Sequence, residues 1–265
     1  MDAADLWGTF AEHAPRVMPG GLAPARASGH GWFAVLTGEL HPDLNECVLT
    51  SRARAEDAAE LAAFIAAAGV PALVSVASSA GPDVTEPLAA AGFARAPVRE
   101  PLMWCAERPP RQTGGLRVEP IRSPAARDEA VAIVAAAHMM APEIADRTLT
   151  PLAALGDGVM AWLAYEGDEA ISVVWATQGP RIGIWSMMTP LAHRRKGGGR
   201  AVLTCALEAL WGPGTEGAFL FSTPAGRPFY ESVGFAAVDD ATTWTSGASD
   251  EFMAAIGQPR AVPGP

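Results

Sequence analysis

A basic, glycine-rich turn is the segment of this sequence whose residue types and spacing are best suited to chemistry. This glycine turn (residues 189–200) holds three consecutive glycines, which let the backbone take φ > 0 and let a ligand approach the amides. It also carries four cations, Arg194, Arg195, Lys196 and Arg200. When a helix follows such a turn, its free N–H groups and the positive end of its dipole favour phosphate. The turn therefore predicts an anion-binding site.

The flanking patterns predict the elements that position this turn. An apolar run at 181–188 leads into it, and helical periodicity at 201–211 follows it. In the second half, strands are expected at 116–121, 159–165, 170–177, 181–188 and 218–222, and helices at 123–138, 201–211 and 224–233. The strands 159–165 and 170–177 would form a hairpin, the glycine turn at 189–200 would join the strand 181–188 to the helix 201–211, and an extended segment would follow at 235–245.

The first half predicts a shorter version of the same order. Strand, helix, strand and helix are expected at 45–50, 55–68, 72–77 and 82–91. Gly92-Phe93 then repeats Gly234-Phe235, about half the chain away, which indicates an internal duplication. Residues 106–115 are polar and rich in proline and glycine, as a linker would be. We therefore expect two domains, 1–108 and 109–265.

Composition and charge narrow the class of protein. The chain has 265 residues, is 49% hydrophobic and 18% charged, and carries a formal net charge of −10. These values are typical of a soluble globular protein and argue against a nucleic-acid binder, while an amine-bearing or cationic substrate fits the charge. The uncharged stretch 61–82 is interrupted by Gly69-Val70-Pro71, so no membrane helix is expected. The acidic N-terminus lacks the basic region of a signal peptide, and the predicted location is cytoplasmic. Three cysteines without ligand spacing predict no metal site: Cys47, Cys105 and Cys205.

Two motifs in the second half resemble those of the GNAT family of N-acetyltransferases. The family pattern Arg/Gln-x-x-Gly-x-Gly/Ala is present as Arg194-x-x-Gly197-x-Gly199, after Met188-Thr189-Pro190. The pattern Asn-x-x-Ala-x-x-Leu-Tyr-x-x-x-Gly-Phe is present as Thr223-x-x-Gly226-x-x-Phe229-Tyr230-x-x-x-Gly234-Phe235, where Tyr, Gly and Phe agree. Two motifs in the right structural order are more specific than either alone.

The resemblance implies the fold and the cofactor. The fold would be α/β (α+β), with two GNAT-like domains, each a mixed, mostly antiparallel sheet flanked by helices. Acetyl-CoA would be the co-substrate, with no metal. Its pyrophosphate would lie on the glycine turn, and its pantetheine arm would pair with the strand edge at Met187 and Met188. The cofactor-binding residues implied in this way are Met187, Met188, Arg194, Arg195, Lys196, Gly197, Gly198, Gly199, Arg200 and Thr223.

The catalytic groups are implied less completely. Tyr230 would donate a proton to the departing thiolate, and the amine would attack directly, without a covalent acyl-enzyme. Many relatives place a glutamate on the strand before the glycine turn, but residues 182–188 contain no carboxylate. Glu143, Asp146 and His138 are the candidates for the general base, and a water chain is as good a candidate as any of them.

The first half is predicted to be a degenerate copy. Ser51-Arg52-Ala53-Arg54 replaces the glycine turn, and Leu88 stands at the position that corresponds to Tyr230. The second half is then expected to transfer acetyl from acetyl-CoA to a primary amine of a small molecule, cationic if the net charge is a guide. A non-catalytic acyl-CoA sensor and an enzyme acting on a protein amine are the alternatives. The oligomeric state stays open, a homodimer included.

Overall fold

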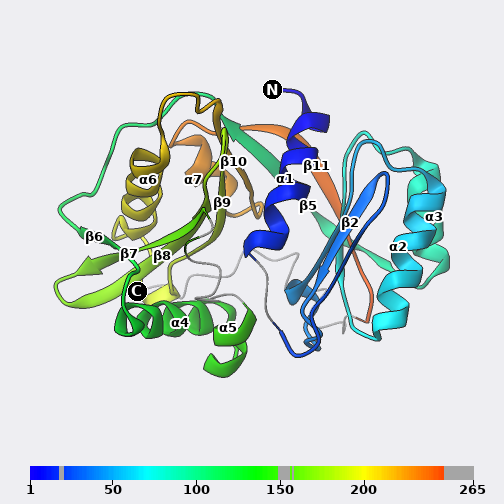
Figure 1. Ribbon diagram of the computed structural model, residues 1–265, viewed down its shortest axis with the longest axis horizontal. Coiled ribbons are helices and arrows are strands. Elements are labelled where there is room, and N and C mark those ends of the chain that lie inside the picture. The colour runs from blue at the N-terminus through cyan, green and yellow to red at the C-terminus, as the bar shows by residue number, and fades with distance from the viewer. Residues whose placement is uncertain (18–20, 149–155, 157, 248–265) are drawn as a thin grey trace.

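The computed structural model describes residues 1–17, 21–148, 156 and 158–247. Over these residues the strands form one eleven-stranded sheet in the order β1-β2-β3-β4-β11-β5-β10-β9-β8-β7-β6 (Figure 1). The strands are β1 (Ala25–Ser28), β2 (Trp32–Leu36), β3 (Asn45–Leu49), β4 (Leu73–Val76), β5 (Ala94–Cys105), β6 (Arg117–Pro120), β7 (Val159–Glu166), β8 (Glu169–Thr177), β9 (Arg181–Met188), β10 (Gly217–Phe221) and β11 (Ala236–Thr245).

Helices cover both faces of this sheet. They are α1 (Ala3–Val17), α2 (Ala55–Ala68), α3 (Pro82–Ala90), α4 (Pro124–His138), α5 (Pro142–Thr148), α6 (Gly198–Leu210) and α7 (Arg227–Glu231), with 3₁₀ turns η1 (Pro42–Leu44) and η3 (Leu191–His193). Buried side chains of α1, α4 and α5 share one apolar cluster on what we term the α1 face. On the opposite α6 face, α6 and α7 cover the second half, and α2 and α3 cover the first.

The last strand of each half lies beside strands of the other half. β5, which ends the first half, pairs with β10 of the second half through Phe219↔Trp104 and its neighbours. β11, which ends the second half, pairs with β4 of the first half through Trp244↔Val74 and its neighbours. β5 and β11 also pair with each other along most of their length. The two halves therefore share one hydrogen-bonded sheet, and α1 lies across its centre (Figure 1).

The predicted fold class is confirmed, and most predicted elements lie within a residue or two of the observed ones. Two differ more. α6 begins at Gly198, so two of the three glycines form its first turn instead of preceding it. α7 begins at Arg227, because residues 223–226 form a turn held by hydrogen bonds from the Gly226 and Arg227 amides to the Thr223 carbonyl. The domain boundary at 108/109 falls between β5 and β6 and stays a prediction.

The expectation of no membrane helix can be compared with the described residues. None of the helices there combines the length and the apolar character that crossing a bilayer requires. All three cysteines are buried and free.

Candidate active site

Strands β9 and β10 separate towards their C-terminal ends. Their parallel pairing runs from Arg181↔Gly217 to Ile184↔Leu220, whereas β9 continues to Met188 and β10 ends at Phe221. Within the described chain, residues 185–188 therefore have no strand partner on the β10 side. An extended ligand can pair with such an edge through main-chain hydrogen bonds. Met187 and Met188, predicted to line this edge, lie on it.

A β-bulge lies in the separated part of β9. Trp185 pairs with Trp175 and Met188 with Val173, so two residues of β9 oppose one residue of β8. Ser186, inside the bulge, has a φ of 42°, which is uncommon for a residue other than glycine. A bulge takes a residue out of the ladder and redirects its backbone groups. The redirected groups lie next to Met187 and Met188, at the predicted edge for the pantetheine arm.

The glycine turn joins this strand end to the N-terminus of α6. Gly197 is the N-cap residue, with a φ of 87°. Gly198 packs against β8 so closely that a β-carbon there would lie 3.0 Å from Cβ of Ser172. A β-carbon on Gly199 would lie 3.6 Å from Met187 Cε, at ordinary contact distance. The first two glycines thus satisfy a backbone and a packing requirement, and the third lies beside the exposed edge of β9.

The N-terminus of α6 is electropositive. Its first turn contains no acidic residue, and no described side chain caps it. Lys196 forms an ion pair with Glu166 at 2.5 Å, and Arg200 Nη2 donates to Ser232 Oγ at 2.7 Å. Arg194 Nε donates to the Thr189 carbonyl at 3.3 Å. Unsatisfied helix N–H groups among cations favour an anion such as phosphate.

Tyr230 lies on α7, beside this helix end. Its ring makes edge contacts with Phe229 and Phe235, at centroid distances of 5.1 and 6.0 Å. Phe229 in turn lies near the first turn of α6, because a β-carbon on Gly199 would be 3.9 Å from its Cζ. Burial raises the pKa of the Tyr230 phenol above its usual value, so the hydroxyl stays protonated at neutral pH. A buried neutral phenol is able to donate a proton.

The predicted residue Thr223 has a structural partner. Its hydroxyl accepts a hydrogen bond from the Gly226 amide at 3.1 Å, which stabilises the turn between β10 and α7. The side chain is nevertheless exposed, close to the end of β10. Its assignment to cofactor binding stays a prediction.

The two predicted carboxylate bases lie on α5. Asp146 forms an ion pair with Arg127 of α4, which offsets its charge. Glu143 is exposed in the first turn of α5. Neither side chain has a described contact with Met187, Met188 or Tyr230. The assignment of either residue as the general base stays a prediction.

Helix α1 is a part of this region that sequence reasoning missed. On the α1 face, Phe10 packs against Trp185 at 4.9 Å between ring centroids, and Trp7 packs against Phe221 at 5.7 Å. His13 Nδ1 lies 2.7 Å from Thr177 Oγ1, which also accepts a hydrogen bond from Trp185 Nε1. Helical spacing of apolar residues within 3–17 could have predicted the helix. It could not have predicted that the helix docks beside β9 and β10.

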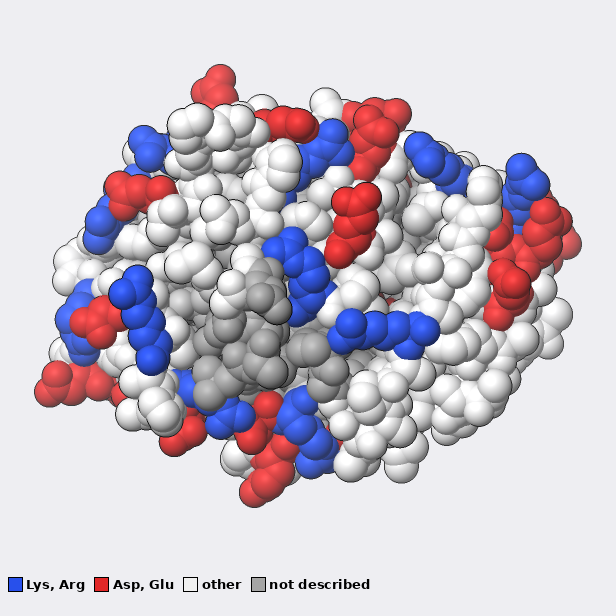
Figure 2. All heavy atoms as spheres, viewed as in Figure 1, with Lys and Arg blue, Asp and Glu red and all other residues white. Residues whose placement is uncertain are grey.

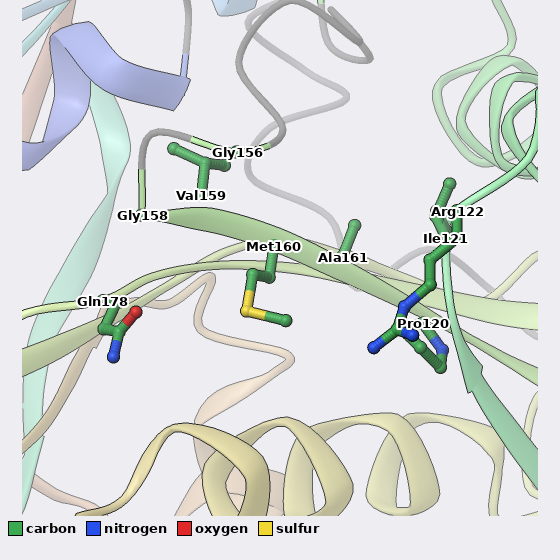
Figure 3. A pocket seen from close by; sticks show the side chains of 9 residues that line it. All are labelled: Pro120, Ile121, Arg122, Gly156, Gly158, Val159, Met160, Ala161 and Gln178. Carbon is green, nitrogen blue, oxygen red and sulfur yellow. The ribbon is translucent and has the colours of Figure 1, made fainter.

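A hollow lies at the end of the second-half strands opposite the glycine turn (Figure 3). Met160 and Gln178 point to one side of the sheet there, and Val159 and Ala161 point to the other (Figure 3). Val159 pairs with Thr177, near the beginning of β9, so this hollow and the glycine turn lie at opposite ends of β9. Among the residues that the structure describes, no His, Cys, Asp and Glu side chains are grouped as metal ligands would be.

Similar folds occur among solved structures, although neither a protein-family model nor a curated protein matches this sequence. A GCN5-related N-acetyltransferase from Kribbella flavida is similar with a TM-score of 0.65 and 15% identity, covering 94% of this chain and 97% of that one. A tandem GNAT protein from the clavulanic acid biosynthesis pathway has a TM-score of 0.57 and 13% identity, with coverage of 94% and 96%. A GCN5-related N-acetyltransferase from Sphaerobacter thermophilus has a TM-score of 0.56 and 11% identity, with coverage of 82% and 76%.

These identities are low, so the likeness is one of fold. It extends over nearly the whole chain for the first two structures, one of which is itself a tandem GNAT protein. The chain thus has the GNAT fold, as the two motifs predicted.

Proposed function

We propose that this protein is an acetyl-CoA-dependent N-acetyltransferase whose second half acetylates a primary amine of a small molecule. One juxtaposition carries the proposal. The unpaired edge of β9 and the uncapped N-terminus of α6 meet at Gly199, and Phe229, whose ring contacts the buried ring of Tyr230, lies against the same glycine. The GNAT fold, which the similar acetyltransferases share, supports the same function.

The residues at this site fit a CoA thioester. Backbone N–H groups from Arg195 to Arg200 would bind the pyrophosphate, and the exposed cations would reduce its charge. The edge at Met187 and Met188 would pair with the amide groups of the pantetheine arm. No carboxylate in the first turn of α6 competes for these N–H groups.

Acetyl-CoA, when bound, supplies an acetyl group that is activated as a thioester. In the reaction we propose, a neutral amine forms the new C–N bond while the C–S bond breaks. A backbone amide near the Ser186 bulge would stabilise the carbonyl oxygen as it gains negative charge. Tyr230 would give its proton to the thiolate, and the proton of the amine would leave to a carboxylate or to water.

Charge supports a cationic acceptor. The chain has a formal net charge of −10, although acidic and basic side chains are interspersed over the face seen in Figure 2. A negative protein attracts cations at long range. Small amines are therefore the acceptors that we place first, ahead of protein amines.

Two measurements on the purified chain test this proposal. Calorimetry with acetyl-CoA should show binding, and a CoA-release assay over alkylamines, aminoglycosides, amino acids and peptides should show turnover with small cationic amines. Tight binding without CoA release from any amine would favour the acyl-CoA sensor. Absence of acetyl-CoA binding would contradict both functions.

A further inference from the structure

The indole of Trp185 is held by a chain of buried hydrogen bonds on the α1 face. Trp185 Nε1 donates to Thr177 Oγ1 of β8 at 2.9 Å, and the same oxygen lies 2.7 Å from Nδ1 of His13 on α1. Trp185 is 8% exposed, Thr177 0% and His13 7%. We term these three residues the Trp185 anchor. It joins α1, which belongs to the first half of the chain, to the strand that forms the open edge.

The hydrogen bonds of the anchor have a direction. An indole N–H can only donate, so the Thr177 oxygen accepts from Trp185. The proton of the Thr177 hydroxyl has two acceptors within reach, His13 Nδ1 at 2.7 Å and the Gly183 carbonyl at 3.5 Å. The shorter distance favours His13, and burial together with Arg16 lowers the pKa of this imidazole, which keeps Nδ1 able to accept. The chain of donors therefore runs from Trp185 through Thr177 to His13.

The backbone of β9 leaves room for the anchor at Gly183. A β-carbon there would lie 2.5 Å from Trp185 Nε1 and 2.9 Å from Phe219 Cζ, and it would also overlap Thr177 Oγ1. Gly183 does not have a positive φ, so its backbone conformation does not require glycine. The close approach of the Trp185 and Thr177 side chains accounts for glycine at this position. The steric requirement is a second observation in favour of the anchor, beside the hydrogen bonds.

The anchor holds the residue at which β9 separates from β10. Ile184 is the last residue of β9 that pairs with β10, so Trp185 is the first one beyond this pairing. Thr177 pairs with Gly183, two residues before Trp185. The indole therefore extends back along β9, away from the bulge at Ser186. Side-chain contacts of Trp185 thus hold the strand where its ladder with β10 has ended.

A different hydroxyl holds the other side of the bulge. Ser172 Oγ, on a fully buried side chain, donates to the Met188 carbonyl at 2.9 Å. Ser172 and Thr177 both belong to β8, and one acts after the bulge and the other before it. A bulge sets the direction of the backbone groups that it contains. Holding both sides therefore fixes the orientation of the amides at Ser186 and Met187.

We propose that the Trp185 anchor positions the bulge of β9 for acyl transfer, with Thr177 and His13 as positioning residues that do not touch the substrate. This inference rests on the proposed function, in which a backbone amide near the bulge stabilises the carbonyl oxygen. Without the Thr177 hydroxyl, the buried indole N–H would lose its acceptor, and the indole would no longer fix the bulge. The degenerate half would then contribute to the reaction through His13.

Substitutions that keep the shape of a side chain and remove its hydroxyl test the anchor. With the best amine of the CoA-release panel, Thr177→Val should lower kcat about tenfold, because small misplacements at a reacting centre have large effects on rate. The Kd for acetyl-CoA should not change, because the glycine turn is untouched. Thr177→Ser keeps the hydroxyl and should keep kcat within about twofold of the wild type. His13→Phe removes only the last acceptor and should lower kcat about threefold.

Thr9→Val is the matched control, on the same helix as His13 but outside the anchor. Thr9 is 9% exposed, and its Oγ1 joins α1 to the second half by accepting from Arg181 Nη1 at 2.9 Å. This variant should keep kcat within about twofold of the wild type. Melting temperatures confirm that every variant is folded at the assay temperature. If Thr9→Val lowers kcat as much as Thr177→Val, or if Thr177→Ser is as slow as Thr177→Val, the anchor is overturned.

Hydrogen exchange separates this inference from the proposed function. Exchange is measured by mass spectrometry on the full chain without ligand, over peptides that span residues 183–190. Thr177→Val should raise the exchange rate of this segment about threefold, and Thr9→Val should not. If the wild type acetylates no amine, the proposed function fails, and faster exchange in Thr177→Val still supports the anchor as the element that holds the bulge. Unchanged exchange overturns the anchor, and faster exchange with unchanged kcat overturns its role in the reaction.

Discussion

Both halves of this molecule contain a parallel strand pair followed by a helix, but only one of the two strand pairs is open. In the first half, β3 and β4 pair from Glu46↔Leu73 to Leu49↔Val76, and the Ala77 amide extends the ladder to the Leu49 carbonyl at 2.9 Å. In the second half, β9 continues four residues past its last partner on β10. The same local order therefore gives a closed sheet in one half and an exposed edge in the other.

The helices that follow these strand pairs, α2 and α6, differ at their N-termini. Arg54 is the N-cap of α2, and Asp57, three residues later, accepts from the Arg54 amide and from the Gly31 amide. Gly197 is the N-cap of α6, and the residue three positions later is Arg200. A carboxylate of the protein itself therefore occupies the N-terminus of α2, whereas the N-terminus of α6 has no such carboxylate and can bind a ligand. A single side chain at the third position accounts for much of this difference.

The largest effect is expected where the halves differ in a proton donor, Tyr230 against Leu88. Tyr230→Phe should lower kcat about 100-fold, as loss of a general acid does, and leave acetyl-CoA affinity unchanged. A CoA-release assay measures kcat, and calorimetry measures the affinity for acetyl-CoA. Tyr165→Phe is the matched control, because its hydroxyl binds Glu129 at the far side of the sheet. Equal kcat values for Tyr230→Phe and the wild type would remove Tyr230 from the mechanism.

The next effect comes from giving α6 the N-terminal carboxylate of α2. Arg200→Asp should weaken acetyl-CoA binding about 30-fold, because a charge repels the pyrophosphate and competes for the same N–H groups. Arg200→Ala, which removes only the cation and its bond to Ser232, should weaken it a few-fold. Titration calorimetry distinguishes the two variants. If Arg200→Asp binds acetyl-CoA as well as the wild type, the phosphates lie elsewhere.

The reverse change in the first half should affect stability and not binding. Asp57→Ala leaves two backbone N–H groups without their acceptor, so the free energy of unfolding should fall by about 2 kcal/mol. Urea unfolding measures this, and the affinity for acetyl-CoA should not change. Glu56→Ala, one residue away and exposed, should shift stability by less than about 0.5 kcal/mol. A loss of acetyl-CoA affinity in Asp57→Ala would mean that the first half also contributes to cofactor binding.

The smallest effect is a difference in pH dependence. The pKa of Glu46 is raised from 4.5 to about 7, so the stability it contributes below pH 4.5 is lost as pH rises towards 7. Burial and Arg16 lower the pKa of His13 from 6.5 to about 4, so its contribution is lost as pH falls from 6.5 towards 4. Relative to Glu46→Gln, the wild type should become less stable with rising pH. Relative to His13→Gln, it should become less stable with falling pH, as urea unfolding across this range would reveal. Parallel profiles would contradict both assignments.

Local signals in the sequence predicted much of the second half. Ser123-Pro124 opens α4 as predicted, and the Ser123 hydroxyl accepts from the Ala126 amide at 3.2 Å. The start of α6 was predicted three residues too late, because glycine has low helix propensity. Packing explains the difference, since Gly198 lets the helix approach Ser172 of β8.

Long-range pairings could not be predicted from this single sequence. Nothing in Leu102 or Phe221 identifies them as partners, and periodicity gives the face of a strand but not its neighbour. The same holds for Trp244 of β11 and Val74 of β4, whose pairing joins the two halves. The resemblance pointed to Glu143 and Asp146 as candidate bases, and the single sequence could not show which other groups lie near the end of β9.

β5 and β11 each pair with a strand of the other half, and this pairing has a consequence for how the chain folds. During synthesis the first half is complete before β11 exists, so the edge of β4 that β11 will cover stays open until β11 has been made. Open edges pair with other chains, and contacts this distant in sequence form slowly. We infer that the first half cannot reach its final form before β11 has been synthesised. The sheet closes only when the last strand inserts between two strands that were made long before it.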